Sequence, residues 1–158
     1  MDLVLDAPER TRRIHRAAAR FCAANGWAPL SEVPLPNGRR ADILALLPDG
    51  SFRIIEVKSC ARDFLTDRKW TEYRDFCDAL LFAVDADFPQ ALLPEDVGLI
   101  CAASMEDWAL LRPPPAHPLA PARRRSMLLR YAMLAGLRAS AAADPEAGLL
   151  ARMALRLE

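Results

Sequence analysis

Residues 39–59 read RRADILALLPDGSFRIIEVKS, and this stretch decides the fold. Two apolar runs of strand-like composition flank the turn sequence Pro48-Asp49-Gly50, and a carboxylate interrupts each run, Asp42 in the first and Glu56 in the second. A lone carboxylate is costly to bury without a partner. The stretch therefore predicts a pair of strands whose two acids belong to one site.

The turns on either side of the first run set the pairing of three strands. Leu35-Pro36-Asn37-Gly38-Arg39 and Leu47-Pro48-Asp49-Gly50-Ser51 share a pattern in which proline begins a type I turn and glycine accepts the left-handed conformation. This pattern is typical of a three-residue hairpin loop with a bulge, whereas a two-residue Asn-Gly turn would require the N–H group that Pro36 lacks. We therefore expect the residues that begin and end each five-residue sequence to face each other.

This register brings three carboxylates into one row. It places Glu32 opposite Asp42 and Asp42 opposite Glu56, and Lys58 lies on the same face two residues after Glu56. Adjacent carboxylates repel one another unless a cation lies among them, and Mg²⁺, with Mn²⁺ able to substitute, is the hard cation that prefers oxygen ligands in phosphate chemistry. The alternative is a solvated polar strand edge with a Glu–Lys pair.

The rest of the chain indicates an α/β arrangement. A first helix is predicted from an N-cap at Asp6 to a stop at Asn25-Gly26, and residues 61–78 return to helical spacing. Strands are expected at 28–35, 39–47, 51–58 and 79–86, with a further strand or hairpin at 97–103 and 108–112. A proline-rich connector and a C-terminal helical extension, about residues 121–157, follow a core of about residues 6–112. We expect one domain over residues 1–158.

Composition excludes several classes of protein. The chain is 53% hydrophobic and 27% charged, which is typical of a globule. No apolar run reaches the roughly 18 residues of a membrane span, and the N-terminus lacks a signal-peptide pattern, so we expect a cytoplasmic protein with no membrane partner. The four cysteines form no C-x-x-C pair and are expected to be buried, reduced thiols rather than a zinc site.

Net charge is zero, so the chain has no bulk attraction to nucleic acid, but its arginines are clustered. The clusters are compatible with contacts to a DNA backbone or with solvated helix faces, and their candidate members are Arg12, Arg16, Arg39, Arg40, Arg123, Arg124 and Arg125. Of the 21 basic residues only Lys58 and Lys69 are lysines, which suggests that an ammonium group is required at both positions.

Asp42, a hairpin, and then Glu56-Val57-Lys58 on an apolar strand resemble the PD-(D/E)xK nuclease signature, with Ala41 in place of the usual proline. The chain also resembles the MmcB-type DNA repair family of bacteria over about residues 10–140. The residues that carry this likeness are SEVPLPNGRRADILAL (31–46), IIEVKSCARDFLTDRKWTEYRDFCDALLFAV (54–84), LLPEDVGLICA (92–102) and RRRSMLLRYA (123–132). The likeness implies a restriction-endonuclease-like α-β-β-β-α-β core with a mixed sheet, to which extra C-terminal strands and helices are added.

The resemblance also implies roles for the central residues. Asp42 and Glu56 would ligate Mg²⁺ or Mn²⁺ together with the carbonyl group of Val57, and Lys58 would be the catalytic lysine. Many nucleases of this superfamily carry a further acid on the first helix.

This chain has His15 at the place where that helix acid is expected. His15 is either a third ligand or a packed or solvated residue, and Glu32 is the candidate that replaces the missing acid. The helix after the E-x-K motif often lends a polar side chain to the site in such nucleases, and the candidates here are Lys69 and Asp67.

Three functions fit these observations. The first is a Mg²⁺-dependent DNA nuclease that acts in repair. The second is a DNA-binding repair accessory that keeps the fold and metal site but cleaves slowly or only with a partner, such as another repair protein. The third is a structural dimerisation module with a solvated polar face. The oligomeric state is open, and a homodimer is compatible with the sequence.

Overall fold

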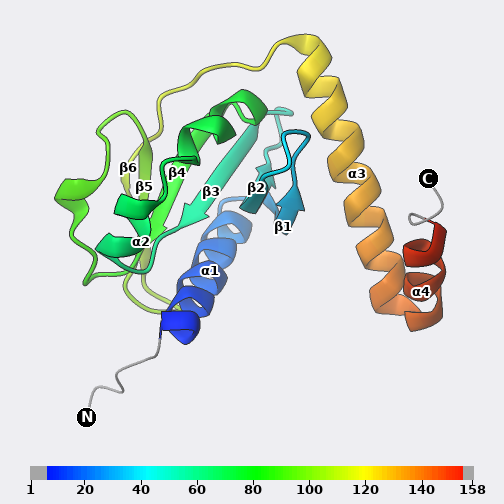
Figure 1. The fold of residues 1–158 in the computed structure, drawn as a ribbon, viewed down its shortest axis with the longest axis horizontal. Helices are drawn as coiled ribbons and strands as arrows, with labels where there is room; N and C mark the ends of the chain where they lie inside the picture. Colours follow the sequence, from blue (N-terminus) through cyan, green and yellow to red (C-terminus); the bar gives the residue numbers. More distant parts are fainter. Residues whose placement is uncertain (1–6, 155–158) are drawn as a thin grey trace. The chain divides into compact units, whose positions relative to one another are not determined.

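A computed structural model describes residues 7–154 of the chain, and its elements follow the predicted α-β-β-β-α-β order (Figure 1). Helix α1 (Ala7–Ala24) precedes the strands β1 (Ala28–Pro34), β2 (Arg40–Leu46) and β3 (Phe52–Val57). The remaining elements are α2 (Ala61–Thr66), the 3-10 helix η1 (Trp70–Phe76), β4 (Ala79–Val84), the short 3-10 helix η2 (Gln90–Leu92), β5 (Gly98–Ala102), β6 (Trp108–Arg112), α3 (Pro121–Ala143) and α4 (Pro145–Ala154). The N-cap expected at Asp6 and the predicted end of the extension, residues 155–157, lie outside the described residues.

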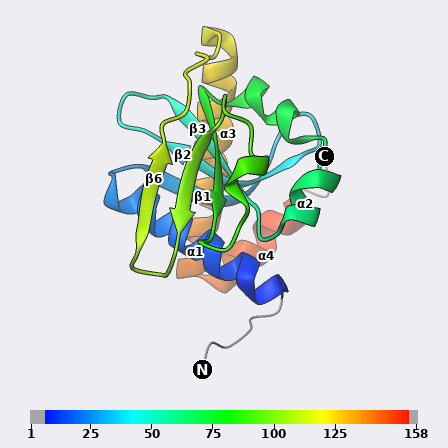
Figure 2. The ribbon, with the colours of Figure 1, turned by 90° about the vertical axis from the view of Figure 1, so that its left-hand side faces the viewer.

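The six strands form one mixed sheet in the order β1-β2-β3-β4-β5-β6 (Figures 1 and 2). The first three strands are antiparallel, β3 to β5 are parallel, and β6 returns antiparallel to β5. The α/β class with a mixed sheet and C-terminal helices is therefore confirmed.

Helix α1 covers one face of this sheet and contacts all six strands. Its apolar residues recur at helical spacing and are buried: Ile14, Ala17, Ala18, Phe21 and Cys22. They pack on alternate strand residues, among them Ile43, Ile55, Val57 and Leu81. The helix ends as predicted, because Gly26 has φ 72° and the Trp27 N–H donates to the Cys22 carbonyl at 3.0 Å.

The opposite face of the sheet carries Glu56, which pairs with Phe82 of β4. The rings of Phe64 in α2 and Trp70 in η1 both pack edge-on against Phe82, with centroids 5.5 Å apart. These contacts place α2 and η1 beside the acids, since Glu56 and Phe82 are neighbours across the ladder.

The two hairpin turns have the predicted geometry. Leu35 N–H donates to the Arg39 carbonyl at 2.8 Å and Leu47 N–H to the Ser51 carbonyl at 2.9 Å, so each loop has three residues. Gly38 has φ 80° and lies in the left-handed region that only glycine adopts readily. The register follows, because Ser31 pairs with Ile43, Val33 with Ala41, and Ile43 with Ile55.

The continuous helix expected over 61–78 is wrong. Helix α2 ends at Thr66, Asp67 is extended (φ −85°, ψ 99°), and η1 begins at Trp70. The carboxylate of Asp67 receives both the Lys58 ammonium and the backbone N–H of Lys69, and such local side-chain bonds compete with helix continuation. Asp67 and Trp70 therefore do not share one helical face.

The expectation that all four cysteines are buried is also wrong. Cys22 and Cys77 are buried and Cys101 is partly so, but Cys60 is exposed. Cys60 precedes α2, a helix with no buried residue of its own, so this part of the chain lies outside the core.

The chain divides into two compact units, Met1–Leu119 and Ala120–Glu158. The second unit is an α3–α4 hairpin, in which Gly148 lies so close to Ala141 that a Cβ atom there would approach the Ala141 Cβ to 2.7 Å. Asp144 begins α4 by accepting the N–H of Glu146 at 3.1 Å. Within residues 7–154, no helix is both long and apolar enough to cross a membrane.

Asp78 ties the proline-rich connector to the sheet in the first unit. Its two carboxylate oxygens accept the N–H groups of Phe52 at 2.7 Å and Leu119 at 2.8 Å. Its own backbone pairs with Phe52 and accepts the His117 N–H. A single buried aspartate thus joins the start of β3 to the end of the connector.

Replacement of Asp78 should destabilise the protein markedly. Asp78→Ala leaves two backbone N–H groups without their charged acceptor, and we expect a loss on the order of 2–4 kcal/mol of unfolding free energy. Asp78→Asn keeps one acceptor oxygen and should lose about half as much. Urea denaturation measures both values, and an Ala variant with the wild-type midpoint would contradict this role.

Candidate functional site

The ladder between β2 and β3 ends immediately before the acids. Its last pair is Ile43 with Ile55, and beyond this pair the hydrogen bonds between the strands are made by side chains. Oε1 of Glu56 accepts the Asp42 N–H at 3.1 Å, and Oδ2 of Asp42 accepts the Val57 N–H at 2.8 Å. Each acid therefore binds the backbone of the other strand, and the two carboxylates are held side by side.

Burial strongly disfavours ionisation of this pair. The residue Glu56 is 4% exposed, and burial followed by the charge of Asp42 raises the pKa of Glu56 to about 9. The pKa of Asp42 is also raised, chiefly by burial, although the Val57 N–H and the charges of Lys58 and His15 oppose the shift. Near neutral pH the pair thus retains a proton that an entering cation would displace.

One oxygen of each carboxylate is used in these bonds, Oδ2 of Asp42 and Oε1 of Glu56. Both residues also line an open cleft of about 510 Å³ between the start of α1 and the segment from Val57 to Asp63. Within residues 7–154 no group of three or more His, Cys, Asp or Glu side chains is placed to hold a metal ion. Two carboxylates are nevertheless sufficient for Mg²⁺, which retains several waters, so the donor set fits this ion.

Lys58 lies at the same cleft, and its ammonium group is paired. Nζ lies 2.6 Å from Oδ2 of Asp67, and the side chains are 6% and 23% exposed, respectively. Burial lowers the pKa of Lys58, but the Asp67 hydrogen bond and the charges of Asp63, Asp67 and Glu56 outweigh it, so the pKa is raised overall. The site therefore contains a buried ammonium group whose charged form is favoured by the surrounding carboxylates.

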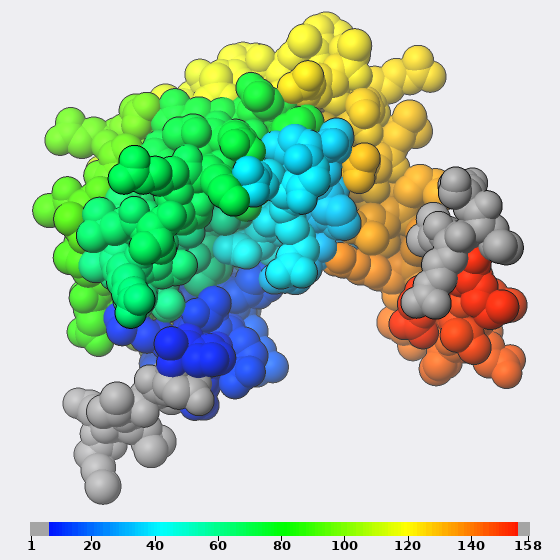
Figure 3. Space-filling view, viewed as in Figure 1, coloured from blue at the N-terminus to red at the C-terminus, as the bar shows by residue number. Residues whose placement is uncertain are grey.

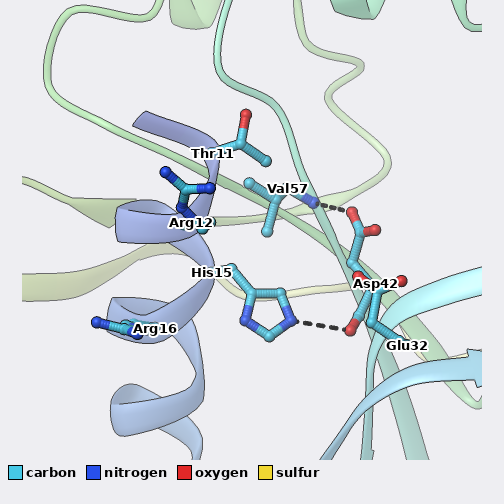
Figure 4. A pocket seen from close by; sticks show the side chains of 7 residues that line it. All are labelled: Thr11, Arg12, His15, Arg16, Glu32, Asp42 and Val57. Atoms are coloured by element: carbon cyan, nitrogen blue, oxygen red, sulfur yellow. Dashed lines mark hydrogen bonds between the residues drawn. The ribbon is translucent and has the colours of Figure 1, made fainter. Parts of the chain in front are cut away.

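Glu32 lies beside Asp42, as the register predicted. Pairs with the predicted register flank it on both sides, and Glu32 and Asp42 line one pocket of about 200 Å³ (Figure 4). Glu32 has φ 52°, a conformation that is rare for a residue with a side chain, and its carboxylate pairs with Arg40. One oxygen of the Glu32 carboxylate is therefore directed at Arg40 and not at the acid pair.

His15 links α1 to β2. Its Nε2 lies 3.1 Å from the Asp42 carbonyl oxygen, and Figure 4 shows the ring pointing from α1 toward β2. A carbonyl group only accepts, so Nε2 carries the proton and donates. A ligand role for His15 would therefore fall to Nδ1, and the contact that the structure records positions Asp42.

The two accessory candidates after β3 differ. Asp67 meets Lys58 directly, whereas it is the backbone N–H of Lys69, not its ammonium group, that contacts Asp67, at 2.9 Å. The Lys69 side chain is exposed. The structure therefore brings Asp67 to the site and leaves a role for the Lys69 ammonium as a prediction.

The candidate DNA-binding arginines fall into three groups. Arg12 and Arg16 are exposed on α1 and line the pocket that contains Asp42. Arg39 pairs with Glu72 at 2.8 Å and Arg40 with Glu32, so both are partly neutralised. Figure 3 shows the β1–β2 hairpin, in cyan, next to the green segment that contains Glu72. The remaining candidates, Arg123, Arg124 and Arg125, lie near the start of α3 in the second unit.

Two residues near the acids, Asp63 and Tyr73, were not among the site residues predicted from the sequence. Asp63 lines the cleft, and its charge helps to raise the pKa of Lys58. Tyr73 is buried and donates its hydroxyl to the Arg40 carbonyl at 3.2 Å, and burial and then the charges of Glu56 and Asp42 raise its pKa. The signal for Asp63 is its place in the first turn after Lys58, whereas the periodicity of Tyr73 indicated packing alone.

The buried state of Glu56 predicts a stability that depends on pH. Folding raises the pKa of Glu56 from 4.5 to about 9, so the folded state holds a proton that the unfolded chain releases. This contribution is complete below pH 4.5 and is lost as the pH rises toward 9. In EDTA, the melting temperature should fall by several degrees between about pH 6 and about pH 8.5, which corresponds to ~1 kcal/mol or more.

Mg²⁺ should reverse this loss at the higher pH, because the ion replaces the proton. Glu56→Gln should flatten the pH dependence in EDTA and abolish the effect of Mg²⁺, since the amide is neutral but keeps an acceptor for the Asp42 N–H. Thermal unfolding followed by circular dichroism measures both effects. A Gln variant with the wild-type pH slope would disprove this assignment.

The comparisons with known proteins agree with this arrangement. A solved structure of a protein of unknown function from Silicibacter pomeroyi has a TM-score of 0.81 and 38% sequence identity over 90% of this chain and 96% of that chain. No curated protein matches the chain. A family model described as DNA repair protein MmcB-like matches residues 5–146, which include both hairpins, both acids and Lys58. The chain therefore belongs to the MmcB-like family of DNA repair proteins.

Proposed function

We propose that this family member is a DNA nuclease that hydrolyses phosphodiester bonds with Mg²⁺ or Mn²⁺. The observation that carries the proposal is the Asp42–Glu56 pair, in which Glu56 is buried and Asp42 half-buried, and which opens onto a cleft that Lys58 also lines. An acid pair with raised pKa values beside an ammonium group, in a cleft, is a combination that marks candidate functional sites. The DNA repair description of the family supports DNA as the substrate.

The acids would hold the ion. Oδ1 of Asp42 and Oε2 of Glu56 are the oxygens not used in the bonds between the strands, and the carbonyl group of Val57 and the carboxylate of Glu32 are the further candidates. When bound, a divalent cation polarises the phosphodiester and lowers the pKa of a coordinated water. The bonds between the strands keep both carboxylates in place before the ion arrives, so little reorganisation is needed.

Lys58 would act on the phosphate. Its ammonium group is charged and shielded from solvent, and it has three donors, of which Asp67 receives one. A donor in a water-poor site can stabilise the negative charge that develops on the phosphoryl oxygens. The exposed guanidinium groups of Arg12 and Arg16, on the other side of Asp42, would contact the DNA backbone and position it without reading its sequence.

A second function is a DNA-binding repair accessory that cleaves slowly or only with a partner. The observation in its favour is the pairing of cations within the protein, since Lys58, Arg39 and Arg40 each contact a carboxylate. With a net charge of zero, the chain has no excess positive charge to support tight DNA binding.

A cleavage assay separates these functions. Labelled linear, flapped, branched and single-stranded DNA are incubated with the protein in Mg²⁺, in Mn²⁺ and in EDTA. We expect metal-dependent products, a loss on the order of 10²–10³-fold in Lys58→Ala, and no products in Asp42→Asn. Asp96→Asn, which removes an acid paired with Arg74, is the control and should cleave normally. DNA binding without products on any substrate would establish the accessory function instead.

The salt dependence of DNA binding tests the α1 surface. Arg12→Ala and Arg16→Ala should each reduce the slope of log affinity against log salt by about 1, because each removes one phosphate contact. Arg20→Ala is the matched control on the same helix, since Arg20 pairs with Glu106 at 3.3 Å. Fluorescence anisotropy at several salt concentrations measures the slopes, and wild-type slopes in both Arg12→Ala and Arg16→Ala would exclude these arginines from the DNA interface.

A further inference from the structure

Lys58 has carboxylates on two sides. On the sheet side, Glu56 projects from the same face of β3 two residues earlier, about 7 Å along the strand, and Asp42 lies next to it. On the helix side, Asp67 lies 2.6 Å from Nζ. A lysine side chain has a flexible four-carbon stem, so its ammonium group can reach either side. The structure shows that it pairs with Asp67.

Asp67 is held firmly in position to receive this ammonium group. Its N–H is shared between the carbonyl groups of Asp63 and Phe64, both at 3.2 Å, and its Oδ1 accepts the Lys69 N–H at 2.9 Å. This leaves Oδ2 directed at Lys58. The break between α2 and η1 thus holds the Asp67 carboxylate in position to bind the Lys58 ammonium group.

Removal of this carboxylate would leave a buried charge in need of a counter-ion. The Lys58 side chain is 6% exposed, so solvent compensates its charge poorly. Glu56 and Asp42 already interact electrostatically with Lys58 and have oxygens outside the bonds between the strands. An ammonium group on those oxygens would occupy the place of a divalent cation.

We propose that Asp67 is a positioning residue that holds the Lys58 ammonium group away from the Asp42–Glu56 pair and so keeps the pair open to a divalent cation. This inference rests on the proposed function, because it assigns the acids to metal binding. It also changes the role expected for Asp67, which acts through Lys58 and not on the metal or the scissile phosphate.

Calorimetric titration with Mn²⁺ alone, without DNA, tests the proposal in four proteins. Asp67→Asn should weaken Mn²⁺ affinity by about 10-fold or more, the range found when a residue that supports metal ligands is removed. Lys58→Met should not weaken it. The double variant Asp67→Asn/Lys58→Met should return to within about 3-fold of Lys58→Met, because the competing cation is gone.

Two further variants protect the test against loss of folding. Asn and Ser at position 67 both keep an acceptor for the Lys69 N–H, so Asp67→Ser should repeat the result of Asp67→Asn. Asp96→Asn breaks a comparable ion pair elsewhere and should bind Mn²⁺ with wild-type affinity. A structure of metal-free Asp67→Asn should show Nζ of Lys58 within hydrogen-bond distance of Glu56 or Asp42.

The outcomes distinguish this inference from the function on which it rests. Wild-type protein that binds no Mn²⁺ would overturn both. Wild-type binding with unchanged affinity in Asp67→Asn would overturn only the role of Asp67. A double variant as weak as Asp67→Asn would likewise overturn it, because the loss would then not pass through Lys58.

Discussion

The reciprocal bonding of Asp42 and Glu56 to the backbone of the neighbouring strand is the interaction on which the rest of the site depends. It replaces the strand ladder beyond Ile43 and Ile55, so the two strands continue side by side without pairing. It also holds Glu56 in a buried and Asp42 in a half-buried environment, which raises their pKa values. The two carboxylates are therefore in position before any ligand binds. Their unfavourable proximity is imposed by the fold itself.

The same demand for charge compensation shapes the next segment. A buried ammonium group two residues after Glu56 requires a carboxylate, and Asp67 provides it at the expense of helix continuity. Local sequence preference and tertiary electrostatics conflict here, and such conflicts are expected at functional sites. On the other face, α1 contacts every strand and sends His15 to the Asp42 carbonyl, so the helix that covers the core also positions one of the acids.

The charge distribution explains how a neutral chain can belong to a DNA repair family. Several basic side chains are neutralised within the protein, as in the contacts of Arg39 with Glu72 and Arg10 with Asp85. Arg12 and Arg16 remain exposed on α1 at the rim of the pocket that contains Asp42. Under the proposed function, these exposed arginines, and not the net charge, would bring a phosphate backbone to the acids.

Sequence alone determined the hairpins and the register of the residues that flank the acids, because proline, asparagine or aspartate, and glycine specify their turns within five residues. It also determined the element order and the α1 core stripe, which follow from periodicity. Only the tertiary structure decided where the helix after β3 ends, that Glu32 pairs with Arg40, and that Lys58 pairs with Asp67. Each of these depends on which charged groups come close together in the folded chain, whether exposed, as in the Glu32–Arg40 pair, or buried, as at Lys58. A pattern of residues along the chain does not give the distances between them.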